Sequence, residues 1–282
     1  MSVGLRILIY LLFVAAVFII AIIIMVAPEK PIESLAAPFK NRFFAHRGLH
    51  DVKKGIPENS IAAFDEACKA GYGIELDVRL TKDQQVVVIH DANLLRATGA
   101  DLEIEEIDYE EILKHPLWGT EHTVPLFSDV LKCVAGRAPI IVEIKPCQNS
   151  LVLSQKTMDI LAPYEGDYCV ESFDPGIVRW IRYNAPVVLR GQLANLPKDY
   201  DDDVPFLGKI FLSRCLFNMV TKPHFVAYKT GAKPWPVKIT KLLGAMHMVW
   251  TSHPKEMGGT PEEDKRRNDS VIFEHYTPPT HY

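Results

Sequence analysis

Carboxylates at short, repeated spacings are the first sign of chemistry in this sequence. Glu75 and Asp77 stand two residues apart in an apolar run, so on a β-strand they would share one face. Glu143 stands in a second such run, and Glu58 lies in an earlier polar stretch. Acidic groups packed together raise one another's pKa values unless a cation neutralises them. Because an all-oxygen ligand set favours a hard divalent ion, these residues predict a calcium or magnesium site.

Basic and imidazole side chains lie at comparable positions. Arg47 and Lys145 are suited to holding a phosphate, the arginine through its planar fork and the lysine as a point charge. His46 and His90 can act as base and acid on opposite sides of a phosphorus atom, since histidine titrates near neutrality. A lone histidine at the end of a strand is more often structural. Two of them beside acidic and basic groups predict metal-assisted cleavage of a phosphodiester.

The elements that would position these groups are short apolar runs that alternate with helical patterns. Eight runs predict parallel strands covered on both faces: Phe43–His46, Gly73–Asp77, Pro139–Ile144, Tyr168–Ser172, Val187–Gln192, Phe225–Lys229, Met248–Ser252 and Val271–His275. Helical spacing lies between them, as at Ile61, Phe64 and Cys68 after the cap candidates Asn59 and Ser60. This alternation predicts a (β/α)8 TIM barrel, an α/β fold whose catalytic groups gather at the carboxyl ends of the strands.

One stretch breaks the alternation. Residues 74–91, IELDVRLTKDQQVVVIHD, have the pattern of two strands joined by a short polar turn at about residues 81–85. So short a connection cannot cross over to a parallel strand, which leaves a β-hairpin. With the turn centred near Asp83 and Gln84, Asp77 would face His90. The hairpin would then return this histidine to the mouth of the barrel.

Short motifs in a fixed order point to a family. The sequence contains HRG (46–48), PENS (57–60), AF (63–64), ELDV (75–78), TKD (81–83), HD (90–91), EIK (143–145), SFDP (172–175) and WT (250–251). A lone HRG or EIK is weak evidence, whereas the ordered set is specific. From about residue 42 to 280 the chain resembles the glycerophosphodiester phosphodiesterase family, relatives of the phosphatidylinositol-specific phospholipase C barrels.

The resemblance implies a role for each candidate residue. His46 and His90 would be the acid–base pair. His46 would deprotonate an adjacent substrate hydroxyl that attacks phosphorus and His90 would protonate the leaving alcohol, or the reverse, and water would open the resulting cyclic phosphate. The implied ligands for Ca²⁺ or Mg²⁺ are Glu75, Asp77 and Glu143, with Glu58 close by. The implied phosphate-binding residues are Arg47 and Lys145. For Trp250 we expect core packing at the end of the barrel first and substrate binding second.

Three features depart from the family pattern. Ser60 replaces the usual threonine, and His253 follows WTS where asparagine is frequent. The last strand, VIFEH, carries Phe273 and Glu274 at the positions of a threonine and an aspartate. These departures concern the late half of the substrate pocket. Glu171, at the end of another strand, is expected to support the metal ligands indirectly.

The first 27 residues differ from the rest of the chain. Residues 7–27 contain no charged side chain, and about 20 apolar residues suffice to span a bilayer as a helix. A cleaved signal peptide is the alternative, but its apolar region is usually only about 7–15 residues long. We therefore expect a transmembrane anchor at residues 1–27, a proline-rich linker at 28–41 and one barrel domain at 42–282.

Charge and cysteine content narrow the possibilities further. Arg6 precedes the anchor while Lys30, Lys40 and Arg42 follow it, which by the positive-inside rule favours a cytoplasmic barrel. Five cysteines without a CxxC motif favour the same side and argue against a zinc site or a disulfide framework. The net charge of −4 argues against a nucleic-acid partner.

The expected reaction is hydrolysis of a glycerophosphodiester to glycerol 3-phosphate and an alcohol. Two alternatives are a lysophospholipase D, which would act on lysophospholipids, and a non-catalytic membrane-tethered module that binds phosphorylated headgroups. Residues 207–220 have an amphipathic helical pattern. We expect an ordinary barrel helix there, with a membrane-surface helix as the alternative.

Overall fold

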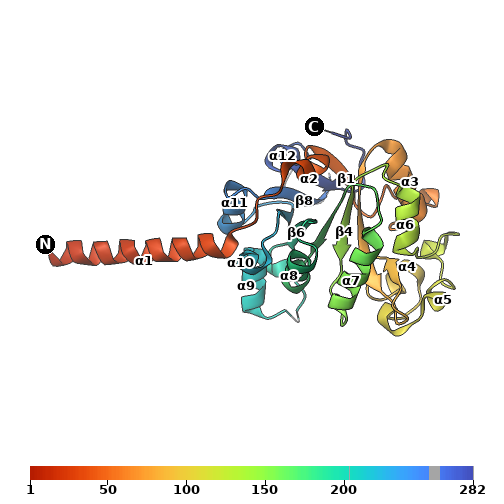
Figure 1. The fold of residues 1–282 in the computed structure, drawn as a ribbon, viewed down its shortest axis with the longest axis horizontal. Coiled ribbons are helices and arrows are strands. Elements are labelled where there is room, and N and C mark those ends of the chain that lie inside the picture. Colours follow the sequence, from red (N-terminus) through yellow and green to blue (C-terminus); the bar gives the residue numbers. More distant parts are fainter. Residues whose placement is uncertain (203, 254–260, 282) are drawn as a thin grey trace.

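The computed structural model of the chain describes residues 1–202, 204–253 and 261–281. Parallel strands form a closed barrel, which confirms the predicted fold (Figure 1). The barrel closes because β1 pairs with both β2 and β9. The eight barrel strands are β1 (Arg42–Ala45), β2 (Gly73–Leu80), β4 (Ile140–Ile144), β5 (Tyr168–Ser172), β6 (Leu189–Ala194), β7 (Phe225–Lys229), β8 (Met246–Ser252) and β9 (Ser270–Phe273).

The remaining strand, β3 (Val86–Val88), runs antiparallel to β2, so the predicted hairpin is present. Its predicted register was wrong by one residue. The backbone N–H of Ile89, rather than that of His90, stands opposite Asp77 and donates to its carbonyl at 3.0 Å. The reason is that the turn is centred on Asp83 alone, since residues 81 and 85 are hydrogen-bonded across it.

Helices cover the outside of the barrel. They are α3 (Ile61–Ala70), α6 (Phe127–Val134), α7 (Ser150–Leu161), α8 (Pro175–Asn184), α9 (Phe206–Ser213), α10 (Asn218–Thr221), α11 (Trp235–Leu242) and α12 (Pro261–Arg267). Helix α3 begins after Ser60, whose hydroxyl accepts the N–H of Ala63 at 3.1 Å, and ends at Gly71 in the left-handed conformation. Ser60, and not the other cap candidate Asn59, is therefore the N-cap of this helix.

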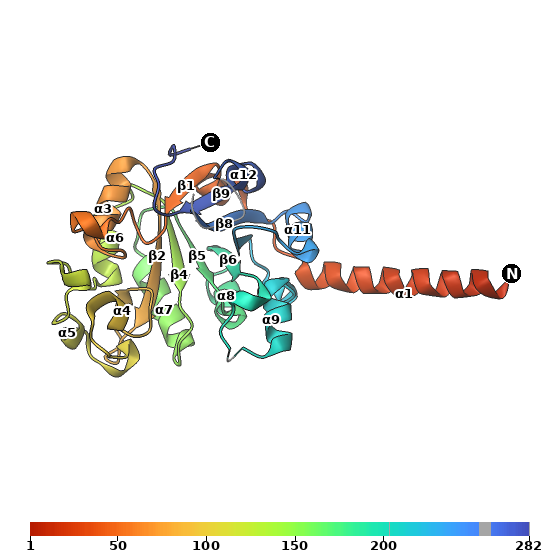
Figure 2. The ribbon, with the colours of Figure 1, turned by 180° about the vertical axis from the view of Figure 1, so that it is seen from behind.

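An insertion separates β3 from β4. Residues 89–126 contain the short helices α4 (Leu95–Thr98) and α5 (Tyr109–Ile112) and the 3-10 helices η3 (Ile104–Glu106) and η4 (Leu117–Gly119). The insertion has its own apolar cluster, in which Val87 of β3 is buried together with Ile104, Ile112 and Val124. Figure 2 shows α4 and α5 on the side of the barrel opposite α1.

The segment expected as a linker closes the base of the barrel. It contains α2 (Glu33–Ala36) and the 3-10 helix η1 (Ala37–Phe39). The Phe39 side chain is 1% exposed, and its ring stacks on that of Phe44 at 5.9 Å between centroids. It packs among barrel residues such as Ile141. Ala36 and Phe39 of the segment expected as a linker are therefore part of the folded core.

Helix α1 (Val3–Val26) projects from the side of the barrel (Figure 1). Its 24 residues have a mean hydropathy of 3.4 over their most apolar window, and by length and composition they are sufficient to cross a membrane. At 1.5 Å per residue the helix is about 36 Å long. Its last turn is not free, because Ile22 and Val26 are buried against Leu216.

Candidate active site

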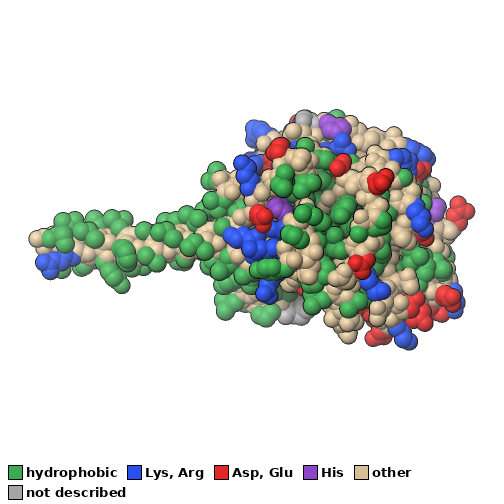
Figure 3. Space-filling view, viewed as in Figure 1, with side chains coloured by type: hydrophobic (Ala, Val, Ile, Leu, Met, Phe, Trp, Pro, Cys, Tyr) green, Lys and Arg blue, Asp and Glu red, His purple; other side chains and the backbone are tan. Residues whose placement is uncertain are grey.

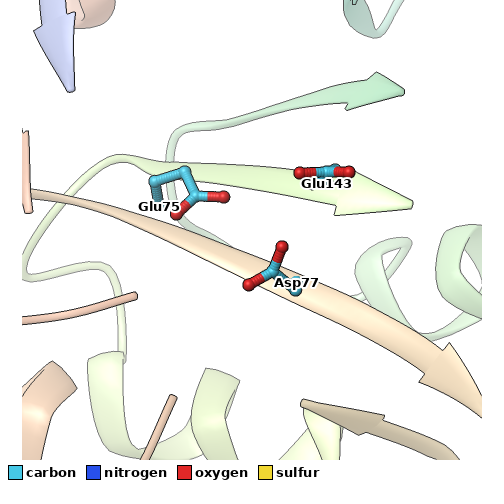
Figure 4. Close-up of side chains that lie close together, drawn as sticks. All are labelled: Glu75, Asp77 and Glu143. Atoms are coloured by element: carbon cyan, nitrogen blue, oxygen red, sulfur yellow. The ribbon is translucent and has the colours of Figure 1, made fainter. Parts of the chain in front are cut away.

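Three carboxylates lie together inside the barrel, toward its mouth (Figure 4). Glu75 and Asp77 lie on β2, and Glu143 lies beside Asp77 on β4 in the parallel register. They face inward because the alternate residues, such as Leu76, are packed into the outer apolar core. One oxygen from each lies within 4.8 Å of the others, and all three residues are buried. The structure therefore brings these three predicted residues together.

Burial and mutual repulsion control the ionisation of this acidic group. Burial, followed by the charges of Asp77 and Glu143, raises the pKa of Glu75 well above its usual range. Burial also raises the pKa of Glu143, although Lys145 opposes the shift. The pKa of Asp77 is held well below its usual range, because Lys145 and further cationic neighbours outweigh the effect of burial. The three carboxyl groups thus differ in their readiness to ionise.

Lys145 stands between two of these carboxylates. Its Nζ lies 2.8 Å from Oδ1 of Asp77 and 2.8 Å from Oε1 of Glu143, and its side chain is 7% exposed. Burial opposes the charged form, but the two carboxylates raise the pKa of Lys145 above its usual value. The ammonium group is therefore a fixed positive charge inside the site.

Arg47 enters the site through a sharp turn. It has φ 56° and is followed by Gly48 at φ 82°, where the backbone approach leaves no room for a Cβ atom. Its backbone N–H donates to Oε2 of Glu75 at 3.0 Å. Its side chain places Nη1 2.8 Å from Oε1 of Glu58 and Nε 3.5 Å from Oδ2 of Asp77. The glycine of the HRG motif thus allows the turn that brings Arg47 to the acidic group.

Glu58, predicted as a metal ligand or a residue close to the metal, pairs with two arginines. Oε1 of Glu58 lies 2.8 Å from Arg47 and 2.7 Å from Nη2 of Arg96, which comes from α4 of the insertion. Burial would raise the pKa of Glu58, but the hydrogen bond from Arg96 and the charge of Arg47 lower it. The guanidinium of Arg96 also lies over the Trp118 ring, 5.4 Å from its centroid. Glu58 therefore holds two guanidinium groups at the mouth.

His46 directly follows β1 and lies between two carboxylates. Its Nε2 is 4.0 Å from Oε2 of Glu75, and its Nδ1 is 3.4 Å from Oε2 of Glu274. Burial lowers the pKa of His46, and Glu274 compensates only in part. Glu274 directly follows β9, and its other oxygen lies 3.1 Å from Nε2 of His50. The imidazole of His46 is thus oriented from both sides.

His90 follows β3 at the end of the hairpin. Its Nδ1 is 2.6 Å from Oδ1 of Asp91, and its side chain is 33% exposed. Nε of Arg79 donates to its backbone carbonyl at 2.7 Å, which fixes the end of the hairpin. His90 is near enough to contribute to the lowered pKa of Asp77, after Lys145. The one-residue slip in register therefore does not remove His90 from the site.

Trp250 of β8 is partly buried. Its Nε1 donates to the carbonyl of Ala227 at 3.1 Å, and its ring meets that of Phe173 edge-on at 5.4 Å between centroids. These contacts are those of a packed side chain at the rim. A hollow of about 940 Å³ opens beside the site, with Arg47 and Trp118 among its lining residues.

Several residues of the site were not predicted as such. The side-chain amide of Asn59 donates to Oδ2 of Asp77 at 2.9 Å, and its backbone N–H donates to the carbonyl of Arg47 at 2.9 Å. The PENS motif contains this asparagine, so a sequence signal existed, but capping explained it equally well. Arg96 had no motif. The position of Glu274 immediately after a barrel strand was a signal that its departure from the family pattern obscured.

Comparison with known proteins identifies the family. A family model described as the glycerophosphoryl diester phosphodiesterase family matches residues 46–270. The chain belongs to this family. A Bacillus altitudinis glycerophosphodiester phosphodiesterase is 38% identical over 117 residues, 39% of this chain and 46% of the relative. The rat lysophospholipase D GDPD1 is 34% identical over 143 residues, 46% of this chain and 44% of the relative. These alignments span less than half of either relative.

The chain has the same fold as a solved structure of an Oleispira antarctica phosphodiesterase. That structure is a complex with the product sn-glycerol-3-phosphate. The TM-score is 0.66 at 19% sequence identity, covering 84% of this chain and 94% of that one. At this identity the similarity concerns the fold.

The acidic group of this family member fits a hard divalent cation. Oxygens bound to opposite sides of a calcium ion stand about 5 Å apart, so three oxygens within 4.8 Å can share one ion. Oε2 of Glu171, on the neighbouring strand beside Glu143, is also buried and has no hydrogen-bond partner among the described residues. Glu75, Asp77 and Glu143 are the residues that would hold the ion.

Proposed function

We propose that the chain is a divalent-cation-dependent phosphodiesterase that cleaves glycerophosphodiesters to glycerol 3-phosphate and an alcohol. The observation that carries the proposal is the buried group of Glu75, Asp77 and Glu143, with two histidines and two fixed cations near it. Family membership supports it, as does the product named for the Oleispira antarctica structure. A bound Ca²⁺ or Mg²⁺ would supply a Lewis acid that polarises the phosphoryl oxygen.

We propose different roles for the two histidines from their surroundings. Burial lowers the pKa of His46, which favours the neutral ring that a general base needs. Nδ1 of His90 lies 2.6 Å from Oδ1 of Asp91, a contact that orients the ring, and we propose His90 as the general acid. In the first step His46 takes the proton of a substrate hydroxyl, whose oxygen bonds to phosphorus, and His90 gives a proton to the departing alcohol. In the second step water opens the cyclic phosphate with the two roles exchanged.

The fixed cations of the site would hold the phosphate. Lys145 and Arg47 are charged and already lie against Asp77, at 2.8 Å and 3.5 Å. A non-bridging phosphate oxygen at this position would meet a point charge on one side and a planar fork on the other. Glu58 orients Arg47 and Arg96 toward the mouth, which we propose as its role in place of metal ligation.

We also propose that α1 is an uncleaved membrane anchor. Its end is built into the barrel: Nδ2 of Asn218 donates to the carbonyl of Val26 at 3.2 Å, and Nζ of Lys222 donates to that of Ala27 at 3.0 Å. Glu29 is ion-paired with the buried Arg190. Cleavage beside Ala27 would remove Val26 and expose Leu216 beneath it. A cytoplasmic barrel is part of this proposal, supported by the positive-inside rule because Lys30, Lys40 and Arg42 follow the helix while Arg6 precedes it.

A lysophospholipase D activity is the second candidate. The anchor would hold the site near lipid, and the rat relative carries that name. A non-catalytic headgroup-binding module is less consistent with the site, because binding alone does not require an acid–base pair of histidines.

The test is turnover by the full chain in detergent, supplied with glycerophosphocholine or lysophosphatidylcholine and with Ca²⁺, Mg²⁺ or chelator. We expect cation-dependent release of choline, and loss of it in His46→Ala and in Glu75→Ala. Glu165→Ala, an exposed residue away from the site, is the matched control. Full activity of the first two variants would refute the proposal. Headgroup binding without turnover would favour the binding module.

A further inference from the structure

The helices around the end of α1 form a common apolar contact with it. Ile22 and Val26 of α1 are buried together with Leu216, and Phe211 of α9 and Ile239 of α11 pack against them. This contact occupies only part of each helix. Residues one helical turn away from these contacts lie on the same faces, and their exposure shows whether the apolar surface extends beyond α1.

Those neighbouring residues are large, apolar and exposed. On α9, Leu207 precedes Phe211 by one turn and is 67% exposed, and the adjacent Phe206 is 73% exposed. On α11, Trp235 precedes Ile239 by one turn and is 50% exposed. Each helix therefore continues the face that touches α1 out into the surroundings.

Large apolar side chains are also exposed at the end of α11 and on α10. Leu242, one turn after Ile239, is 85% exposed, and Leu243 beside it is 40% exposed. Met219 and Val220, one turn after Leu216, are 45% and 39% exposed. Figure 3 shows hydrophobic side chains gathered over the end of the barrel domain from which α1 emerges, with Lys and Arg side chains among them.

We infer that this surface lies on the bilayer that α1 spans. The lipid-facing surface consists of Phe206, Leu207, Met219, Val220, Trp235, Leu242 and Leu243. The inference rests on the anchor proposed above, since continuity with α1 identifies a lipid bilayer as the occupant. Apolar residues of this size exposed beside a membrane-spanning helix are those that enter the interface between headgroups and acyl chains.

Positive charge at the edge of the lipid-facing surface is also consistent with a lipid bilayer. Lys238 and Lys241 of α11 are exposed, and Lys30 is exposed where its side chain lies against Gly244 just beyond α11. Lysines at the level of the headgroups attract anionic lipids. The surface thus combines apolar anchors with a basic border.

The lipid-facing surface also connects to the mouth of the barrel. Nζ of Lys209 on α9 donates to the carbonyl of Tyr200 at 3.1 Å, and Tyr200 meets Phe173 edge-on at 6.3 Å between centroids. Phe173 in turn contacts Trp250 at the rim. Seating α9 on the bilayer therefore holds the mouth beside the lipid surface rather than away from it.

Tryptophan fluorescence of the full chain in vesicles tests the inference. The vesicles are made of phosphatidylcholine with ordinary or brominated acyl chains, because bromine quenches tryptophans that contact it. The reporters are Leu207→Trp and Leu242→Trp, with the wild type subtracted, and Trp235 itself, isolated by Trp235→Phe. The matched control is Leu113→Trp at the end of α5, 41% exposed on the opposite side.

We expect loss of the added emission at positions 207 and 242 in brominated vesicles, loss of the Trp235 contribution, and no change at position 113. Alkaline carbonate extraction of the wild type separates the two claims. A chain that stays with the vesicles while all three reporters remain bright would overturn the lipid-facing surface and leave the anchor standing. A chain that is extracted would overturn both. Because Trp235 is native, the measurement does not depend on whether an added tryptophan is tolerated.

Discussion

Oε2 of Glu274 lies 3.4 Å from Nδ1 of His46, on the far side of the imidazole from Glu75. The other oxygen of Glu274 contacts His50, so the carboxylate is fixed in turn. A carboxylate at Nδ1 holds that nitrogen as a donor and leaves Nε2 as the proton acceptor that faces the acidic group. Glu274 is therefore a positioning residue for the proposed base.

Glu274→Gln should lower kcat by about 100-fold, the size of effect expected when a reacting group is misplaced by about 1 Å. Glu274 raises the pKa of His46 against the larger effect of burial, so its removal lowers that pKa further. A base with a lower pKa stays unprotonated to lower pH. The acidic limb of the kcat/KM profile should therefore move to lower pH.

Glu274→Asp keeps the charge and should lie between the wild type and Glu274→Gln in rate. A purely structural role would lower the rate of Glu274→Gln without moving its pH profile. That outcome would remove Glu274 from the description of the base.

The difference between Glu274 and Glu75 shows what the sequence could reveal about the site. Glu75, Asp77 and Glu143 were predictable because strand alternation alone places them on the inner face of neighbouring strands. Glu274 approaches His46 only because β9 pairs with β1 when the barrel closes, a contact between the two ends of the domain. Local spacing carries no information about such a contact.

Lys145→Met should destabilise the cation-free protein. The ammonium group neutralises Asp77 and Glu143 inside the site, and removing one partner of a buried ion pair costs about 3–5 kcal/mol. Saturating Ca²⁺ should reduce the loss, since the ion neutralises the same carboxylates. The measurement is urea unfolding of the full chain in detergent, with and without Ca²⁺.

Lys132→Met is the control for this substitution. Lys132 pairs with Asp129 at 2.8 Å, but its side chain is 75% exposed, so its loss should cost no more than about 1 kcal/mol. Equal losses in the two variants would show that the Lys145 pair contributes no more than a surface pair.

Cation binding should release a proton from Glu75. Burial and the neighbouring carboxylates raise the pKa of Glu75, so the cation-free site holds a proton above the usual range of a carboxyl group. A carboxylate must lose that proton to bind a metal, so affinity should increase with pH through the same window. Isothermal titration with Ca²⁺ in two buffers of different ionisation enthalpy measures the release. Identical heats in both buffers would contradict the prediction.

The base of the barrel should weaken in acid through His224. Burial, followed by the charge of Arg190, lowers the pKa of His224 to about 4. The unfolded chain takes up this proton near pH 6.5. The unfolded state therefore binds more protons between these values, and the free energy of unfolding should fall as pH drops from about 6.5 toward 4.

His224→Asn should flatten this part of the stability profile, because asparagine can still accept the Arg190 N–H but does not titrate. The comparison is urea unfolding of both proteins at pH 7 and pH 5. A variant as acid-sensitive as the wild type would show that other groups control this window.

The fold was more predictable than its boundaries. The eight barrel strands follow from apolar runs that are buried on both faces, whereas residues 28–41 carry three prolines that hide any periodicity. The Phe39 ring is a core residue because it covers the open base of the barrel, a requirement of the closed fold and not of the local sequence. The hairpin register was wrong by one residue because residues 81 and 85 pair across a turn centred on Asp83.

Anomalous diffraction from crystals of the full chain grown with Mn²⁺, an ion that takes hard oxygen sites, tests the shared cation most directly. A single anomalous peak within about 2.0–2.6 Å of one oxygen from each of Glu75, Asp77 and Glu143 is the predicted result. A manganese ion bound elsewhere, with no peak beside the three carboxylates, would contradict the metal-assisted mechanism.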